Sequence, residues 1–237
     1  MSDLPIQPHG PLRSLAPGLH VVEGRWKRSP LGRRMTVLET EPGRVALHAS
    51  MRLDEAGTTE LMGLGRPAWI LVPNDFHSSE AGALAEAWPD ARVLIHSGAS
   101  GATRAGLPRI DGTIAEAWPE SLSGRLEATE LAGLSFHESA FLHVATRTLV
   151  LTDLCFNFAR DDASGLLALI LRINGVLGRF RPSRLLRFAF LKDRHALLDS
   201  LEPVLAWDFD RVVVSHGSVL EAGGKEAFTR ALEVIRA

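Results

Sequence analysis

The chain has 237 residues, of which 46% are hydrophobic and 23% are charged, and its formal net charge is −2. This composition suits one large globular domain and gives no global reason to expect nucleic acid or a membrane as a partner. The single cysteine, Cys155, excludes an intrachain disulfide framework and a cysteine-rich zinc site. There is no apolar run of about 18 residues and no signal-peptide pattern in M-S-D-L-P-I-Q-P, so we expect a soluble, cytoplasmic protein.

The first part of the chain predicts strands and a helix after an irregular start. Residues 1–30 are rich in Pro and Gly and are expected to be irregular or to form a sheet edge. Two short strands follow at 33–40 and 44–51, separated by the turn signal E-P-G. A helix is expected over 54–63.

A βαβ unit is predicted next. Residues 68–73, A-W-I-L-V-P, form a continuous apolar run that is typical of a strand covered on both faces. Ser78 or Ser79 can cap the helix that follows, and Glu80 suits the positive end of its dipole. Another buried strand, at 91–96, completes the unit.

The second half of the chain predicts a β-hairpin, helices and one last strand after a loop-rich stretch that extends to about residue 134. In chain order these elements occupy 135–144 and 148–153 for the hairpin, 162–192 and 193–206 for helical segments, 209–217 for the strand and 225–236 for an amphipathic helix. No internal repeat or long linker interrupts the chain. We therefore expect a single domain, 1–237, with a helical basic insertion at about 160–192.

Three polar motifs stand where predicted strands end: D-F-H, T-D and S-H-G, which contain His77, Asp153 and His216. The carboxyl ends of strands in an open α/β sheet converge on one edge, where sites are usually built. Two imidazoles and a carboxylate are ligands for zinc, iron or manganese. The alternative is that each motif is an ordinary turn or helix cap, as Asp and Ser commonly are.

Two of these stretches, T-L-V-L-T-D and V-V-V-S-H-G, resemble the later motifs of the metallo-β-lactamase-like hydrolases. In that superfamily a bridging aspartate follows a strand such as L-F-T-G-D, which Asp153 matches with Thr152 in place of the usual Gly. Its last histidine lies in P-G-H-G, which His216 matches. The resemblance implies an α/β fold of the αββα four-layer sandwich type, with metal at the upper edge of the two sheets.

The stretch L-G-R-P-A-W-I-L-V-P-N-D-F-H is similar to an uncharacterised branch of the superfamily, a domain-of-unknown-function family with P-N-x-x-H-H after the buried strand. The second histidine of that motif is Ser78 here. The similarity to this branch covers most of the chain and implies no known reaction.

The superfamily's first metal motif, H-x-H-x-D-H, is degenerate in this chain and can be aligned in two ways. Starting at Asn74, its ligand positions hold Asn74, Phe76, Ser78 and Ser79, which would abolish the site. Starting at Asp75, they hold Asp75, His77, Ser79 and Glu80. The second alignment also matches A-G-A-L to the usual I-G-G-L, and we prefer it. The aspartate that orients the attacking water is then lost to Ser79, and Asp75 or Glu80 is expected to take a catalytic role.

The resemblance also implies a histidine from the hairpin as a ligand. His137 is expected in this role, although a turn-based alignment places the slot nearer Leu134 and leaves His143 as an alternative. Either histidine is also plausible as an ordinary sheet residue. His48 is a candidate for contact with a metal-bound imidazole, and His96 is expected to be structural.

These assignments predict a metal-dependent hydrolase with a variant, mononuclear site formed by His77, His137, Asp153 and His216. The expected cofactor is one divalent ion, either zinc or iron or manganese. The alternative is a non-hydrolytic module on the same fold, metal-free or iron-binding, that serves in binding or redox chemistry. These motifs do not predict the substrate, because proteins of one fold act on many different substrates.

A basic segment lies between Asp162 and Asp193, which enclose no acidic residue. Its cationic residues are Arg172, Arg179, Arg181, Arg184, Arg187 and Lys192. One reading is a solvated helix face. The other is a cationic lid that draws an anionic substrate or a membrane surface. The expected partner is an anionic small molecule, membrane contact is a secondary alternative, and nucleic acid is not expected.

Overall fold

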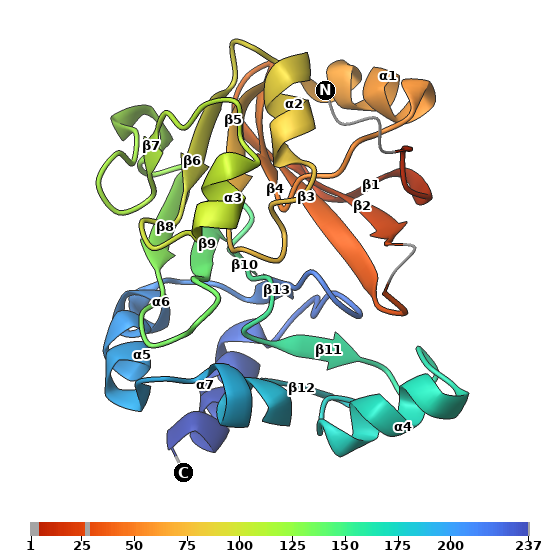
Figure 1. The fold of residues 1–237 in the computed structure, drawn as a ribbon, viewed down its shortest axis with the longest axis vertical. Coiled ribbons are helices and arrows are strands. Elements are labelled where there is room, and N and C mark those ends of the chain that lie inside the picture. The colour runs from red at the N-terminus through yellow and green to blue at the C-terminus, as the bar shows by residue number, and fades with distance from the viewer. Residues whose placement is uncertain (1–4, 27–28, 237) are drawn as a thin grey trace.

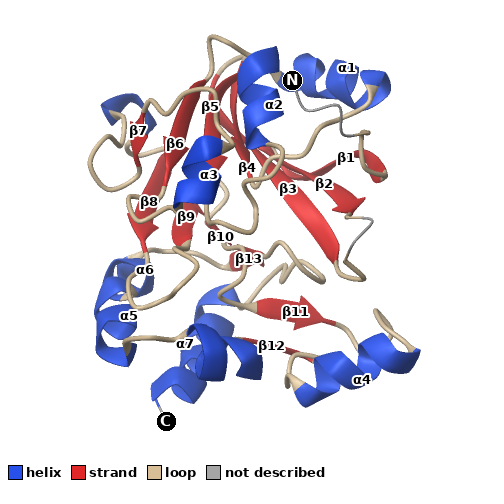
Figure 2. Cartoon of the chain, viewed as in Figure 1, coloured by secondary structure: helices blue, strands red, loops and turns tan. Residues whose placement is uncertain are grey.

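Two β-sheets pack face to face and carry helices on their outer faces (Figure 1), as the strands and helices coloured in Figure 2 also show. This arrangement comes from a computed structural model, which describes residues 5–26 and 29–236. It is the αββα sandwich that the sequence predicted.

The first sheet has seven strands in the order in which they occur along the chain. They are β1 (His9–Ala16), β2 (Leu19–Arg25), β3 (Gly32–Glu41), β4 (Arg44–His48), β5 (Arg66–Val72), β6 (Arg92–Ile95) and β7 (Gly112–Thr113). Strands β1 to β4 pair antiparallel, and β4 to β7 pair parallel. The parallel part contains the βαβ unit predicted from the two apolar runs.

The N-terminal region is more regular than its composition suggested. Strand β1 is an edge strand, as one reading of the sequence expected, but β2 pairs on both sides. The Pro-Gly pair at 17–18 forms the turn between them, with Gly18 at φ +76°. Proline and glycine thus mark a hairpin turn here. Residues 1–4, 27 and 28 of the expected irregular start lie outside the described residues.

The second sheet has the strand order β13-β10-β9-β8. Its strands are β8 (Leu126–Glu130), β9 (Ser139–His143), β10 (Thr148–Val150) and β13 (Arg211–Val213). The predicted hairpin is confirmed as the antiparallel pair β9–β10, and β13 lies parallel to β10. Strand β8 falls in a stretch that was expected to be loop-rich, where its alternating polar residues gave no apolar run to identify it.

Seven α-helices, one 3-10 helix and one π-helix occur in the described residues. They are α1 (Glu55–Leu64), α2 (Ala81–Ala87), α3 (Gly101–Ala105), η1 (Glu120–Leu122), α4 (Gly165–Ile173), η2 (Leu186–Phe190), α5 (Arg194–Ser200), α6 (Glu202–Ala206) and α7 (Gly224–Arg236). The expected serine cap of α2 is wrong: Glu80 occupies that position without a side-chain capping bond. Ser78 instead donates to the Asp75 carbonyl oxygen in the preceding turn. None of these helices is long and apolar enough to cross a membrane.

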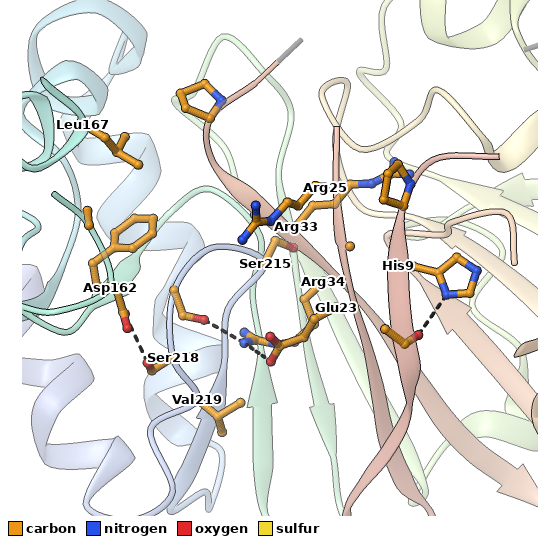
Figure 3. Close-up of a pocket in the computed structure, with 18 of the residues that line it drawn as sticks. His9, Glu23, Arg25, Arg33, Arg34, Asp162, Leu167, Ser215, Ser218 and Val219 are labelled. Atoms are coloured by element: carbon orange, nitrogen blue, oxygen red, sulfur yellow. Dashed lines mark hydrogen bonds and ion pairs between the residues drawn. The ribbon is translucent and has the colours of Figure 1, made fainter. Parts of the chain in front are cut away.

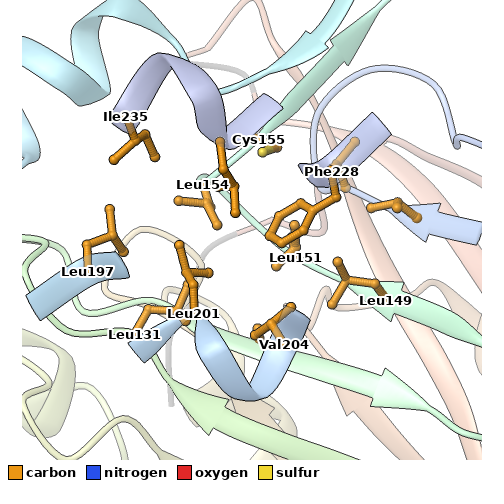
Figure 4. Packing of buried hydrophobic residues seen from close by; sticks show 14 of the residues in the cluster. Leu131, Leu149, Leu151, Leu154, Cys155, Leu197, Leu201, Val204, Phe228 and Ile235 are labelled. Carbon is orange, nitrogen blue, oxygen red and sulfur yellow. The ribbon is translucent and has the colours of Figure 1, made fainter. Parts of the chain in front are cut away.

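Alternation along the strands divides the core into layers. Ile70 points to the cluster beneath α1 and α2, whereas its neighbour Leu71 points to the cluster between the sheets. Leu149 likewise packs toward the C-terminal helices, and Val150 packs between the sheets. Figure 4 shows the helix side of the second sheet, where Phe228 of α7 lies among leucines.

The segment expected to be rich in helix is only partly helical. Helix α4 ends near Gly175, and a strand, β12 (Arg179–Arg181), then pairs antiparallel with β11 (Phe156–Phe158). Gly175 and Gly178 have positive φ values, which end the helix and turn the chain toward β11. Helix α4 packs on a small local core and lies at the lower right of Figure 1, whereas Leu186 of η2 belongs to the large core beneath the second sheet.

Candidate metal centre

His77, Asp153 and His216 meet at one edge of the sandwich, where their ligand atoms all lie within 4.8 Å of one another. His77 follows β5, Asp153 follows β10 and His216 follows β13. Asp153 lies between the two histidines: its Oδ2 is 3.3 Å from His77 Nε2, and its Oδ1 is 3.2 Å from His216 Nε2. The structure thus brings together the three strand-end residues that the sequence singled out.

The Asp153 carboxylate and its loop are held by two buried polar residues. Glu138 accepts backbone hydrogen bonds of 2.8 Å from both Thr152 and Asp153. Asn74 Nδ2 donates to Asp153 Oδ2 at 2.6 Å, while Asn74 Oδ1 accepts from the His77 backbone N–H at 2.8 Å. One amide side chain therefore orients two of the three candidate ligands.

His216 is oriented by the backbone of the first sheet. Its Nδ1 donates to the Gly32 carbonyl oxygen at 2.5 Å, which leaves Nε2 directed toward Asp153. An imidazole that donates from one nitrogen in this way offers the other as a metal ligand. Gly217, next to it, has φ +88°, and a Cβ there would lie 2.2 Å from the Asn157 carbonyl oxygen. The S-H-G motif therefore needs its glycine.

Arg34 supports the same loop and was not identified from the sequence. Its buried guanidinium donates to the carbonyl oxygens of Val214 and of Gly217, the latter at 2.7 Å. These two carbonyls flank His216 along the chain. Glu23 balances the charge, with its Oε1 2.9 Å from Arg34 Nη2 (Figure 3).

The electrostatics of the cluster favour a charged carboxylate between the histidines. Burial alone would raise the pKa of Asp153, but the charge of His77 and the hydrogen bond from His216 outweigh it and place that pKa well below its usual value. Burial lowers the pKa of His216, but the hydrogen bond and charge of Asp153 raise it overall. Burial and the nearby Asp153 charge raise the pKa of Glu138 to about 7.

A cavity of about 490 Å³ opens over the three residues. Its wall is largely aromatic, with Phe76 stacked on Phe136 at 5.5 Å and edge-on to Phe190 at 5.8 Å between ring centroids. Ser79 and Arg33 also line it. The cavity therefore combines a candidate metal centre with an apolar wall and one cationic side chain.

A larger cleft of about 930 Å³ adjoins this cavity (Figure 3), and Arg33 lines both. Residues of both charges line the cleft. Its arginines are Arg13, Arg25, Arg33 and Arg34, and its acidic residues are Glu23, Asp161, Asp162 and Glu221. The cleft is thus a polar channel beside the apolar cavity.

The other predicted site residues lie away from this group. His137 Nδ1 is 2.8 Å from Asp75 Oδ2, and Asp75 also accepts from the Ser100 backbone N–H and from Thr103 Oγ1. Glu80 is buried and paired with Arg33. In the described part of the chain, none of these predicted residues lines the cavity over His77. The structure does not bring Asp75, Glu80 or His137 to the three candidate ligands, and their suggested roles stay predictions.

Three further histidines, His48, His96 and His143, are buried in the fold. His143 Nδ1 lies 2.7 Å from Thr146 Oγ1 at the turn of the hairpin. His96 Nδ1 accepts from the Gly98 backbone N–H at 2.9 Å. His48 is buried edge-on against Phe141, and among the described residues neither of its ring nitrogens has a hydrogen-bond partner.

Asn74 and Glu138 join Arg34 as supporting residues that the sequence analysis did not assign. Asn74 had a signal, because P-N precedes the histidine in the similar uncharacterised branch. Glu138 had none, since a lone acidic residue in a predicted hairpin reads as an exposed strand position.

No family model and no curated protein matches the sequence. Among solved structures, a metallo-β-lactamase from Hirschia baltica has a TM-score of 0.62 and 12% identity, with 97% of this chain and 98% of that chain covered. The DIM-1 metallo-β-lactamase has a TM-score of 0.63 and 9% identity, covering 98% and 97%. FIM-1 from Pseudomonas aeruginosa, in its mono-zinc form, has a TM-score of 0.60 and 11% identity, covering 100% and 97%. Because the likeness extends over nearly the whole of each chain, this protein has the metallo-β-lactamase fold.

Proposed function

We propose that the protein is a metal-dependent hydrolase in which His77, Asp153 and His216 hold one divalent ion, with zinc as the first candidate. The observation that carries the proposal is the approach of two imidazoles and a carboxylate to within 4.8 Å of one another. Three protein ligands with an open position are the arrangement of catalytic zinc sites. FIM-1, which has the same fold, has been solved in a mono-zinc form, so a single zinc ion is compatible with this fold.

A zinc ion bound here supplies a Lewis acid for a carbonyl or phosphoryl oxygen and lowers the pKa of water. The chain's own residues orient the ligands and shape the site. Asn74 and Glu138 hold the Asp153 loop, and the Gly32 carbonyl fixes the ring of His216. The aromatic wall makes the lining of the cavity largely apolar, and electrostatic interactions are stronger beside an apolar surface than in bulk water.

Ser79 stands where a two-metal site would have an aspartate ligand. It lines the cavity at the position that the preferred alignment assigns to the family's aspartate, and it offers only a neutral hydroxyl. Asp75 and Glu80, the predicted substitutes, would have to leave His137 and Arg33 to act on the cavity. One ion is therefore the better-supported occupancy. The same serine favours a second candidate function, a metal-binding module without hydrolytic activity.

The proposed substrate is a small molecule with an apolar part and an anionic group. The aromatic wall of the 490 Å³ cavity accounts for the apolar part. Arg33 lines both the cavity and the polar cleft but is paired with Glu80, so Arg25, in the cleft, is the residue that accounts for the anionic group.

A panel of chromogenic β-lactam, thioester, phosphodiester and lactone substrates tests the proposal on metal-free protein reloaded with zinc, manganese or iron. We expect hydrolysis of at least one class that needs added metal and disappears in Asp153→Asn. His195→Ala, on the exposed face of α5, is the control and should keep full activity. Binding of one metal ion without turnover of any class would instead support the non-hydrolytic module.

A further inference from the structure

Helix α4 turns an apolar stripe toward solvent. Leu166, Leu169, Ile170 and Ile173 follow the i, i+3, i+4, i+7 spacing that places residues on one helix face. They are 73%, 52%, 44% and 59% exposed, whereas Leu171 on the opposite side is buried in the small local core. A helix with only one apolar face would bury that face. Helix α4 is apolar on both its buried and its exposed face, and no described residue covers the exposed stripe.

The outer stripe continues onto the π-helix η2. Leu185 is 54% exposed and Phe188 is 81% exposed. Arg184 Nη1 donates to the Ile173 carbonyl oxygen at 3.1 Å, and the Leu185 backbone N–H donates to Asn174 Oδ1 at 3.2 Å. These bonds join the end of α4 to the start of η2. We call the combined area the α4–η2 surface: Leu166, Leu169, Ile170, Ile173, Leu185 and Phe188.

Within 163–192, the segment that carries the α4–η2 surface, the charged residues are all cationic, and Asp161 and Asp162 come just before it. Arg172, Arg179 and Arg184 are exposed, and the Arg187 guanidinium lies 5.6 Å from the centre of the Phe188 ring. No acidic residue occurs over 163–192, although the whole chain carries a net charge of −2. Positive charge is therefore concentrated around the exposed apolar side chains.

The α4–η2 surface adjoins the mouth of the candidate metal cavity. Leu185 belongs to the surface and also lines the cavity. Leu186 and Phe190 of η2 line the cavity as well, together with Phe76, which is 56% exposed. An object that covers the α4–η2 surface would therefore lie against the cavity entrance.

The positive charge of this segment distinguishes between two partners for the α4–η2 surface, a second copy of the chain and a lipid bilayer. In a twofold dimer the same patch meets itself, so arginine would face arginine with no acidic residue of the segment to pair with. A bilayer with anionic phospholipids offers what the surface needs: acyl chains for leucine, isoleucine and phenylalanine, and phosphate groups for arginine. We propose that the α4–η2 surface docks on membranes rich in anionic phospholipids and holds the cavity mouth at the lipid surface. This docking uses none of the three candidate metal ligands.

Co-sedimentation of the full chain with vesicles tests the proposal. We expect binding to phosphatidylcholine vesicles that contain phosphatidylglycerol, weak binding to phosphatidylcholine alone, and a loss of binding as salt rises. Removing metal with a chelator should leave vesicle binding unchanged, so this result is separable from the outcome for the hydrolase.

Two double variants separate the apolar and the cationic contributions to vesicle binding. Leu166→Gln with Ile173→Gln should weaken binding roughly tenfold or more, because both side chains lose their apolar contact. Arg172→Gln with Arg179→Gln should weaken binding by roughly tenfold and reduce its salt dependence. Met62→Gln with Ile110→Gln makes the same change at exposed apolar residues elsewhere and should bind as wild type does. Thermal melts check that each variant is folded.

Three results would overturn the proposal: no binding to either vesicle, equal binding to both, or wild-type binding by both test variants. Size-exclusion chromatography with light scattering identifies the competing occupant. A dimer that dissociates in the Leu166→Gln, Ile173→Gln variant, without vesicle binding by the wild type, would assign the surface to a second copy of the chain.

Discussion

Asn74 Nδ2 donates a 2.6 Å hydrogen bond to Asp153 Oδ2, and this bond links the loop after β5 to the loop after β10. The other end of the same amide accepts from the His77 backbone N–H. Asn74 is 2% exposed, so water cannot replace either bond easily. The relative position of two candidate metal ligands therefore depends on one side chain that is not itself in the candidate ligand group.

Replacing Asn74 should weaken metal binding without removing a ligand. In Asn74→Ala, the Asp153 carboxylate and the His77 loop lose their shared partner, and metal affinity is expected to fall by about 10–100-fold. The free energy of unfolding should fall by roughly 1–3 kcal/mol, because buried polar groups lose their partners. Competition with a chromogenic chelator measures the affinity. Ser78→Ala is the matched control in the same loop, and equal affinity of both variants with wild type would contradict this role.

Asp75 is expected to stabilise the fold and leave metal binding unaffected. It accepts bonds from Ser100, Thr103 and His137, and these bonds outweigh burial and keep its pKa below the usual value. Asp75→Asn should lower the free energy of unfolding by roughly 1–3 kcal/mol at neutral pH, measured by urea denaturation. The metal content should stay that of wild type. A variant of normal stability that loses metal or turnover would restore Asp75 to the catalytic role predicted from the sequence.

His48 gives a pH dependence with a definite sign. Burial and the nearby His77 charge lower its pKa from 6.5 to about 3, so the folded chain keeps the ring neutral while the unfolded chain protonates near 6.5. Its contribution to stability is complete above pH 6.5 and is lost as the pH falls below that value. The loss is about 1.4 kcal/mol per pH unit until the folded-state pKa is reached.

His48→Leu should remove this dependence, since neither ring nitrogen has a hydrogen-bond partner to lose among the described residues. Between pH 7 and pH 5, metal-free His48→Leu should lose about 2 kcal/mol less stability than wild type in urea denaturation. His195→Gln, on the exposed side of α5, should follow wild type. Parallel pH profiles for His48→Leu and wild type would show that His48 is not the group responsible.

The sequence predicted best those features that depend on a local pattern of residues. Continuous apolar runs identified β5 and β6, and the hairpin β9–β10 followed from its turn signals. Polar residues directly after β5, β10 and β13 were expected at one edge, and His77, Asp153 and His216 meet there.

The supporting residues could not be predicted, because their partners are far away in the sequence. Arg34 bonds to Val214 and Gly217, about 180 residues later, and nothing near Arg34 indicates this. Motif alignment also placed Asp75 and Glu80 in ligand positions without specifying which way their side chains turn. The structure pairs Asp75 with His137 and Glu80 with Arg33, partners that lie 62 and 47 positions away in the sequence.

Metal content measured by elemental mass spectrometry tests the central claim most directly. The protein is purified without added metal or chelator, as wild type, His77→Ala and the control His195→Ala. The three-ligand centre predicts about one zinc, manganese or iron ion per chain in wild type and control, and a loss of that ion in His77→Ala. Background metal in all three proteins, even after reloading, would contradict a metal centre formed by His77, Asp153 and His216.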